Sequence, residues 1–221
     1  IFAVAALGAA FGASAASVSG NVGVVSEYMF RGVNQSNGAA VQGSLQLNTD
    51  IGLYAGTWAS NIDGGKTEVD LYGGYAKKLG AVSIDVGAIA YLYEQDKHLP
   101  QDLDVQEIYA GFGVGPVSTK VFWTNDAAGS NNSEENWYIS GDLAQPVMGV
   151  TANAHVGYTA GRSTDNNTAS NHVWDFSLGI TKDLGNGLSA SMTVYDTARG
   201  GNATNVDDTK FVVGLNKAFT L

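Results

Sequence analysis

The stretch "VSGNVGVVSEYMFR" (residues 18–31) alternates small or apolar side chains with polar ones at a period of two. Successive side chains of a β-strand point to opposite faces, so this pattern predicts a strand with one apolar and one polar face. Both charged residues of the stretch, Glu27 and Arg31, fall on the polar face. What that face contacts depends on whether the rest of the chain repeats the pattern.

The same alternation returns along the chain, and no stretch after residue 17 has a convincing helical period. The face that carries Trp58 is undecided, because its strand has the weakest pattern. The sequence therefore predicts an all-β fold of twelve strands, over residues 18–31, 41–48, 53–62, 67–75, 82–93, 106–114, 117–123, 136–143, 150–160, 174–181, 188–194 and 210–219.

The connections between these strands alternate in length. Long polar segments such as "EQDKHLPQDLD" and "GRSTDNNTASNH" take turns with short ones such as "TDIG" and "GVGP". Outer-membrane barrels combine short periplasmic turns, longer extracellular loops and an even number of strands. We therefore predict that residues 17–221 form a 12-stranded antiparallel transmembrane β-barrel in the bacterial outer membrane, with lipid around it.

Aromatic residues also gather at the predicted strand ends. Outer-membrane barrels carry a girdle of aromatic side chains at each membrane interface. The residues that fit such girdles are Trp123, Trp137 and Trp174 at the loop ends, and Tyr75, Phe112 and Phe219 at the turn ends.

The first residues, "IFAVAALGAAFGASAAS", are uncharged, apolar and rich in small side chains, and they contain the A-x-A pattern Ala13-Ser14-Ala15. This composition is typical of the apolar and cleavage regions of a secretory signal peptide. The run is too short for the ~20 residues that a membrane-spanning helix needs. We expect residues 1–16 to be a signal peptide that this sequence enters partway through.

Composition excludes several functions. A net charge of −10 argues against nucleic acid as a partner, because nucleic-acid binding needs a basic surface. The absence of Cys removes disulfides, zinc–thiolate sites and thiol catalysis. No motif indicates metal, phosphate-loop or nucleotide binding, so we expect no cofactor and no metal.

The polar faces of the strands predict what lines the barrel. A charged side chain facing lipid costs ~2–4 kcal/mol near the membrane midplane, so we expect the strand charges to face a watery lumen. Acids outnumber bases there, and acidic pores favour cations. The expected pore-lining residues are Glu27, Arg31, Glu68, Asp70, Asp85, Glu107, Lys120, Asp142, His155, Asp175 and Lys210.

The expected strand pairing also predicts ionic neighbours. Closure of the first strand on the last would place Glu27 opposite Lys210 and Arg31 near Asp208. Cross-strand charge pairs of this kind contribute roughly 0.2–1 kcal/mol each.

Two further expectations concern the middle of the barrel. The hairpin at "KKLG" would fold Asp70 back toward Asp85. Lys120 would lie between Glu107 and Asp142, as a structural counter-ion.

Several segments resemble a known family. The segments "VSEYMFRGVNQS" (25–36), "LYAGTWASNID" (53–63), "EVDLYGGYAKKLG" (68–80) and "DVGAIAYLYEQD" (85–96) are similar to the TorF-type porin family of proteobacterial outer membranes. The resemblance covers the mature chain, most clearly residues 25–93, and it implies location and architecture more than a substrate. Family members usually end close to a terminal aromatic residue, whereas here Phe219 is followed by Thr220 and Leu221.

Three functions stay open at this point. The first is a porin-like channel for passive diffusion of small hydrophilic solutes or ions, leaning toward cations. The second is a closed outer-membrane barrel acting as an adhesin or scaffold, which would pack its lumen shut. The third is an outer-membrane hydrolase using His155 beside Asp175, but no Ser stands out as a nucleophile, so we expect no enzyme. The transported solute and the oligomeric state are left open.

Overall fold

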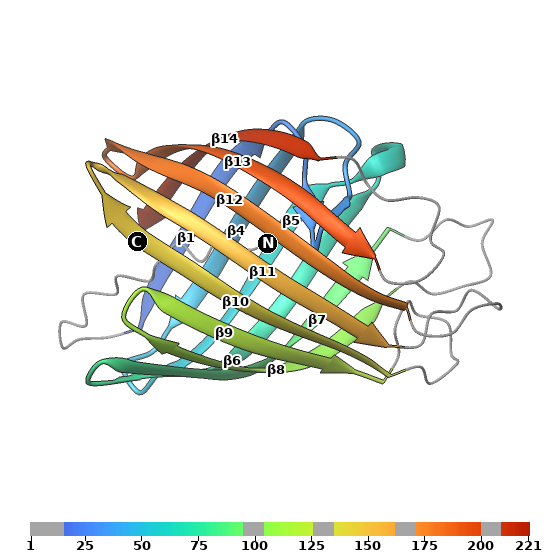
Figure 1. Ribbon diagram of the computed structural model, residues 1–221. Coiled ribbons are helices and arrows are strands. Elements are labelled where there is room, and N and C mark those ends of the chain that lie inside the picture. The colour runs from blue at the N-terminus through green and yellow to red at the C-terminus, as the bar shows by residue number, and fades with distance from the viewer. Residues whose placement is uncertain (1–15, 95–103, 126–134, 162–170, 200–208) are drawn as a thin grey trace.

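The computed structural model describes residues 16–94, 104–125, 135–161, 171–199 and 209–221, and these close into one antiparallel barrel (Figure 1). Each barrel strand pairs with its sequence neighbours, and the first strand also pairs with the last, which confirms the predicted fold. The twelve barrel strands are β1 (Ser17–Val25), β4 (Ala40–Asn48), β5 (Leu53–Asn61), β6 (Thr67–Leu79), β7 (Val82–Tyr93), β8 (Val105–Val114), β9 (Val117–Thr124), β10 (Asn136–Val147), β11 (Val150–Gly161), β12 (Asn171–Gly185), β13 (Leu188–Arg199) and β14 (Lys210–Thr220).

Three short elements lie outside the barrel wall. The strands β2 (Met29–Phe30) and β3 (Val33–Asn34) form a separate two-stranded hairpin, and η1 (Asp63–Gly65) is a single turn of 3₁₀ helix. No helix in the described part of the chain is long and apolar enough to cross a membrane. The predicted signal peptide lies almost wholly outside the described residues.

The seam between β1 and β14 closes the ring. Val24 of β1 lies opposite Leu215 of β14 on one side and opposite Val41 of β4 on the other. Closure leaves none of the described barrel strands at an unpaired edge, so the backbone N–H and C=O groups of the wall bond to one another. This is the condition that a β-structure must meet within lipid.

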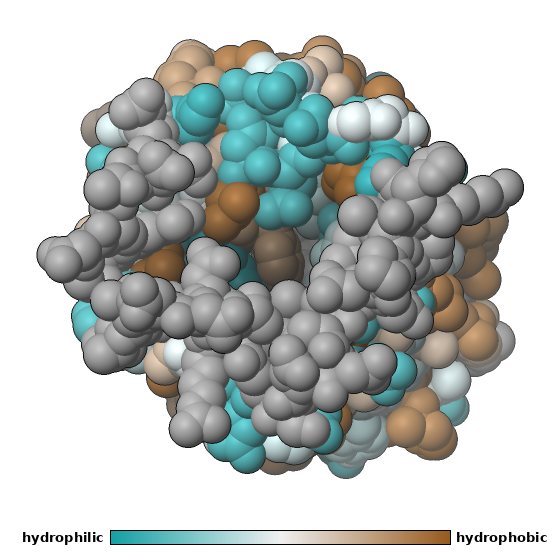
Figure 2. Space-filling model, turned by 90° about the vertical axis from the view of Figure 1, so that its right-hand side faces the viewer, coloured by the Kyte–Doolittle hydropathy of each residue, from teal (hydrophilic) through white to brown (hydrophobic). Residues whose placement is uncertain are grey.

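The two faces of the wall differ as the alternation predicts. Large apolar side chains cover the outside, where Leu178, Ile108 and Phe211 are each more than half exposed. The inside carries most of the charged and hydroxyl-bearing side chains of the strands. Figure 2, which views the barrel from the right-hand end of Figure 1, shows hydrophobic residues along much of the outer edge and hydrophilic residues toward the opening. Trp137 and Trp174 lie on the outer face near one end, and Phe112 and Phe219 near the other.

The strand connections alternate in length, as expected. Those at one end of the barrel are two to four residues long and span 49–52, 80–81, 115–116, 148–149 and 186–187. Those at the other end span 26–39, 62–66, 94–104, 125–135, 162–170 and 200–209. This arrangement matches short periplasmic turns and longer extracellular loops.

The first strand is shorter than predicted. β1 ends at Val25, and the Ser26 N–H makes a last bond, 2.9 Å long, to the Val213 carbonyl of β14. The chain then leaves the wall and turns into the barrel. Tyr28 and Phe30 continue the apolar face of the predicted strand 18–31, which places them outside, but in the structure they lie inside, because the alternation of a strand stops where its pairing stops.

A charge on the outer face tests this placement. Leu178 lies in the middle of β12 and is 68% exposed, so Leu178→Lys should lower the free energy of unfolding in lipid by about 2–4 kcal/mol. Leu184→Lys, at the turn end of the same strand, is the control and should cost about 0–1 kcal/mol. Denaturant titration of the barrel in lipid vesicles measures both, and equal costs would contradict the outward orientation of Leu178 at the level of the acyl chains.

Candidate functional site

The connection between β1 and β4 folds into the lumen as a hairpin, which we call the lumen hairpin (residues 26–39). Met29 pairs with Asn34, and Phe30 pairs with Val33. The two residues of the turn, Arg31 and Gly32, have φ angles of 46° and 78°. Positive φ at both central positions is the signature of a type I′ turn, whose twist suits a two-residue hairpin. Figure 1 shows this blue hairpin turned inward beside β5.

Short polar contacts hold the base of the lumen hairpin. The Gln35 N–H donates to the Tyr28 carbonyl at 2.7 Å, and the Tyr28 N–H donates to Ser36 Oγ at 2.8 Å. The N–H of Asp63, the first residue of η1, donates to the Gln35 carbonyl at 2.7 Å. Asn34 Oδ1 accepts from the Ser36 N–H at 3.2 Å, as in an Asx turn. The base is thereby tied to itself and to the neighbouring connection.

Tyr28 anchors one side of the lumen hairpin to the wall. Its ring packs on Trp58, with centroids 5.2 Å apart, and its hydroxyl donates to Glu68 Oε1 at 3.1 Å. Burial, with the charges of Glu68 and Asp70 nearby, raises the pKa of Tyr28, so the phenol stays a donor. This answers the open question about Trp58, which faces the lumen.

Arg31 anchors the tip of the hairpin to the opposite wall. Its guanidinium donates two parallel hydrogen bonds to the Glu107 carboxylate on β8, at 2.8 and 2.6 Å. The Tyr91 hydroxyl of β7 donates to the same carboxylate at 3.0 Å. Burial alone would disfavour the charged form, but Tyr91 and Glu107 raise the pKa of Arg31 above its ordinary value. The tip therefore carries a permanent positive charge.

Three aromatic rings surround the same guanidinium. The Arg31 Cζ atom lies 4.2 Å from the ring centroid of Tyr138, 5.0 Å from that of Phe122 and 4.8 Å from that of Phe30. Phe122 is on β9 and Tyr138 is on β10, whereas Phe30 belongs to the hairpin. Cations within about 6 Å of an aromatic centroid are attracted by the ring. Arg31 is thus held by charge, hydrogen bonds and rings together.

Gly32, at the tip of the lumen hairpin, packs closely against β12 and β13. A Cβ atom at this position would collide with Cγ2 of Thr197 on β13 and would lie 2.8 Å from Cβ of Asp175 on β12. The hairpin therefore contacts the wall at β6, β8 and β12–β13. Only a residue without a side chain fits at its tip, both for space and for backbone conformation.

His155 lies in a second polar cluster of the inner face. Its Nδ1 is 2.6 Å from Asp142 Oδ1, and its Nε2 is 2.9 Å from Asp175 Oδ1. The Tyr138 hydroxyl is also 2.9 Å from Nε2. Both ring nitrogens face carboxylates, so within the described residues neither faces a Ser hydroxyl that it could activate. The cluster ties β10, β11 and β12 together.

Lys120 belongs to a third polar cluster, nearer the short turns. Its Nζ is 2.6 Å from Asp85 Oδ2 and 4.7 Å from the ring centroid of Tyr109. The Tyr54 hydroxyl donates to Asp85 Oδ1 at 2.6 Å and is also hydrogen-bonded to the Tyr109 hydroxyl. The expectation that Lys120 sits between Glu107 and Asp142 was wrong.

The expected approach of Asp70 to Asp85 was also wrong. β6 and β7 run on to the two-residue turn at 80–81, so Asp70 lies opposite Tyr91 and Asp85 lies opposite Ala76. Asp70 instead lies next to Glu68, the preceding inward-facing residue of β6, and the two side chains are each 1% exposed.

Two ion pairs were predicted where the first strand closes on the last, Glu27 with Lys210 and Arg31 with Asp208, and the structure contains the first of them. Lys210 Nζ lies 3.8 Å from Glu27 Oε1, as expected. Arg31 does not take the seam position, because the hairpin carries it across the lumen to Glu107. Its expected partner Asp208 lies outside the described residues.

All predicted lining residues that lie on strands have the inward parity: Glu68, Asp70, Asp85, Glu107, Lys120, Asp142, His155, Asp175 and Lys210. Sequence reasoning missed the aromatic residues that share the lumen with them, Tyr28, Trp58, Phe122 and Tyr138. Gly32 was the one available signal, because a two-residue type I′ turn favours Gly, but Arg31 before it is not one of the residues that favour positive φ. Among the described residues, no group of three or more His, Cys, Asp or Glu side chains is arranged to hold a metal.

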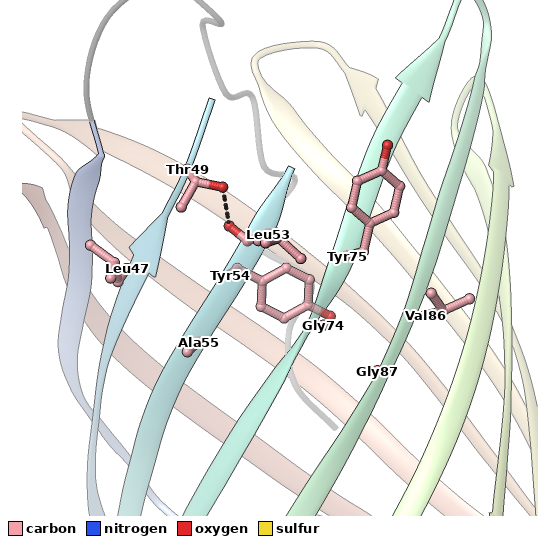
Figure 3. Close-up of a pocket in the computed structure, with 9 residues that line it drawn as sticks. All are labelled: Leu47, Thr49, Leu53, Tyr54, Ala55, Gly74, Tyr75, Val86 and Gly87. Atoms are coloured by element: carbon pink, nitrogen blue, oxygen red, sulfur yellow. Dashed lines mark hydrogen bonds between the residues drawn. The ribbon is translucent and has the colours of Figure 1, made fainter. Parts of the chain in front are cut away.

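A hollow on the outer face is not part of this site. Leu47, Leu53 and Val86 line it and are about half exposed on the lipid-facing side. It lies beside the short turn at 49–52, where Thr49 Oγ1 donates to the Leu53 carbonyl at 2.9 Å (Figure 3). Its lining is almost wholly apolar, so acyl chains and not hydrophilic solutes match it.

The barrel is similar to solved outer-membrane porins. A structure described as "KdgM porin" matches with a TM-score of 0.60 at 9% identity, covering 92% of this chain and 99% of that one. "KdgM porin in complex with disordered oligogalacturonate" matches with a TM-score of 0.59 at 8% identity and the same coverage. The outer membrane protein opdK from Pseudomonas aeruginosa gives 0.46 at 12% identity, covering 85% of this chain and 59% of that one. Identities this low show the fold alone, and the two KdgM structures carry that conclusion: this chain has the closed antiparallel barrel of those porins.

The chain belongs to a bacterial family described as "Bacterial protein of unknown function (Gcw_chp)", whose model matches residues 9–221. No curated protein matches the sequence. The apolar outer wall and the porin architecture locate the protein in the bacterial outer membrane. The TorF-type assignment stays an expectation.

Gly32 offers a direct test of the lumen hairpin. Gly32→Ala adds a methyl group against Thr197 and Asp175 at positive φ, so we expect a loss of about 2–4 kcal/mol in unfolding free energy, or a displaced hairpin. Gly64→Ala is the matched control, because Gly64 has a φ of 72° and nothing within 4 Å of its added Cβ. It should cost about 1–2 kcal/mol from backbone strain alone. Equal losses in a denaturant titration would show that the tip does not pack against β12 and β13.

Proposed function

We propose that this protein is a porin-like channel through which small hydrophilic solutes or ions diffuse passively, with a preference for cations. The observation that carries the proposal is a closed barrel with an apolar outside and a polar, charged inside. A polar, charged inner face is typical of the water-filled barrels of porins. The lumen hairpin then sets the narrowest part of the path.

The charge of the inner face supports the preference for cations. The lining residues comprise seven acids and, besides His155, three bases: Glu27, Glu68, Asp70, Asp85, Glu107, Asp142 and Asp175 against Arg31, Lys120 and Lys210. Each of these three bases has one carboxylate partner, which leaves an acid excess. Glu68 and Asp70 have no basic partner within the described residues. Acidic rings in a pore raise the local concentration of cations.

One of the structurally similar porins indicates which class of solute a barrel of this architecture can bind. One KdgM porin structure was solved in complex with oligogalacturonate, a hydrophilic ligand. That supports passage of hydrophilic solutes through barrels of this architecture. The acid excess inside this barrel favours small cations over anions of that kind.

A closed barrel acting as a scaffold or adhesin is the second candidate. The observation that favours it is the lumen hairpin, which contacts the wall at β6, β8 and β12–β13 and so narrows the interior. Conductance in a planar bilayer separates the two candidates. Discrete ion-conducting steps support the channel, and an electrically silent, correctly folded barrel refutes it.

The acid pair on β6 should set the ion selectivity. The double variant Glu68→Gln and Asp70→Asn removes two buried inner-face carboxyl groups, so under alkaline conditions that ionise this pair the cation-to-anion permeability ratio should fall by about twofold or more. Asp50→Asn, in an exposed short turn, is the control and should leave the ratio unchanged. Reversal potentials under a salt gradient measure the ratio. A preference for anions in the unmodified protein would contradict the proposal.

The Arg31–Glu107 pair should set the conductance. Glu107→Gln leaves a buried guanidinium without its carboxylate, which costs about 3–5 kcal/mol and should release the tip of the hairpin. We expect a larger and noisier single-channel conductance. Asp142→Asn also removes one inner-face charge but touches no part of the hairpin, so it should change selectivity and not conductance. A conductance of Glu107→Gln at or below that of the unmodified channel would refute this role.

A further inference from the structure

The surroundings of the Arg31 guanidinium come mostly from the barrel wall. Glu107, Tyr91, Phe122 and Tyr138 are contributed by the four consecutive strands β7 to β10. The hairpin itself adds only the ring of Phe30. We call the four wall residues the guanidinium cage. The cage is a property of the barrel, and Arg31 is the group that occupies it.

The cage has the chemistry of a receptor for a planar cation. Glu107 is 6% exposed and presents both carboxylate oxygens to the two terminal nitrogens of Arg31, at 2.8 and 2.6 Å. The hydroxyl of Tyr91, itself 3% exposed, fixes that carboxylate through a 3.0 Å hydrogen bond. Phe122 and Tyr138 contribute ring centroids 5.0 and 4.2 Å from Cζ. Two parallel bonds and stacked rings suit a guanidinium and not a compact ammonium ion.

We propose that the guanidinium cage is a binding site for solutes that carry a guanidinium group, and that Arg31 is a resident ligand that such a solute displaces. The site goes beyond the proposed channel function, because it would bind its ligand whether or not the lumen conducts. A solute in the cage would free the tip of the lumen hairpin. Binding and the opening of the lumen are therefore coupled.

The anchoring of the hairpin is compatible with this exchange. Its base is held by Gln35, Ser36 and Asp63, and its side by Tyr28 on Glu68, all away from the cage. Arg31 is joined to that base by a short segment, so exchange requires only the tip to move. A group on a short tether competes with an effective concentration in the millimolar range. Free solutes at millimolar concentration can therefore compete with it.

The test removes the Arg31 side chain by mutation and adds a small molecule with the same guanidinium group from solution. Arg31→Asn creates an Asn-Gly turn, which favours the type I′ conformation and tolerates positive φ, so the hairpin keeps its shape. Methylguanidinium is then titrated into the purified barrel in detergent micelles by calorimetry. N-methylurea, which has a similar shape without charge, and methylammonium, which has charge without the planar fork, are the control ligands.

We expect Arg31→Asn to bind methylguanidinium at least about tenfold more tightly than the unmodified protein, in which the tethered Arg31 competes. The double variant Arg31→Asn with Glu107→Gln should lose that gain, because the bidentate acceptor is gone. N-methylurea should bind neither variant, and methylammonium should bind Arg31→Asn at least about tenfold more weakly than methylguanidinium.

Three results would overturn the proposal: no gain in Arg31→Asn, a gain that survives Glu107→Gln, or equal binding of methylguanidinium and methylammonium. Resistance to unfolding in SDS before heating shows that each variant is folded. If Arg31→Asn does not fold, Arg31→Gly is titrated in its place with the same criteria. Binding without bilayer conductance would refute the channel and leave the cage intact, whereas conductance without binding would refute the cage alone.

Discussion

Closure of the backbone hydrogen-bond network is the constraint from which the rest of this structure follows. Lipid offers no partner for a peptide N–H or C=O group, so a sheet that spans a membrane must pair its first strand with its last. Here β1 pairs with β14 from Ser19 to Val25, and twelve strands complete the ring. Closure separates an outside, where apolar side chains such as Leu178 meet acyl chains, from an inside where most charged and hydroxyl-bearing side chains of the strands lie.

Many of the charged side chains inside the barrel pair with one another, in three groups. Lys120 is matched to Asp85 nearest the short turns, His155 lies between Asp142 and Asp175, and Arg31 is matched to Glu107. Each pair joins different strands or joins the hairpin to the wall, so the charges help to fix the shape of the lumen. The guanidinium is the only one of these groups that the barrel wall does not itself supply.

The period of two was enough to predict the strands of the wall. Each side chain of a wall strand faces either lipid or the lumen, so the apolar residues at alternate positions, such as Val22 and Val24, mark the lipid-facing side. The ends of that pattern were not predictable in the same way. Residues 26–31 keep the alternation after their pairing has stopped, so Tyr28 and Phe30 were assigned to the wrong face. Partners across the lumen also escaped prediction, because Arg31 and Glu107 meet through the curvature of the whole barrel. The register of a β-sheet predicts which residues lie opposite each other on adjacent strands, but it does not predict contacts across the lumen.

The lumen hairpin has a consequence for the order in which the protein folds. Its tip bonds to a residue 76 positions later in the chain, and Ser26 at its base bonds to Val213, 187 positions later. Contacts so distant in sequence carry a large loop-closure entropy and form after local strand pairing. The earliest residues of the barrel are therefore among the last to reach their final positions, and the interior is completed only when the sheet has become a ring.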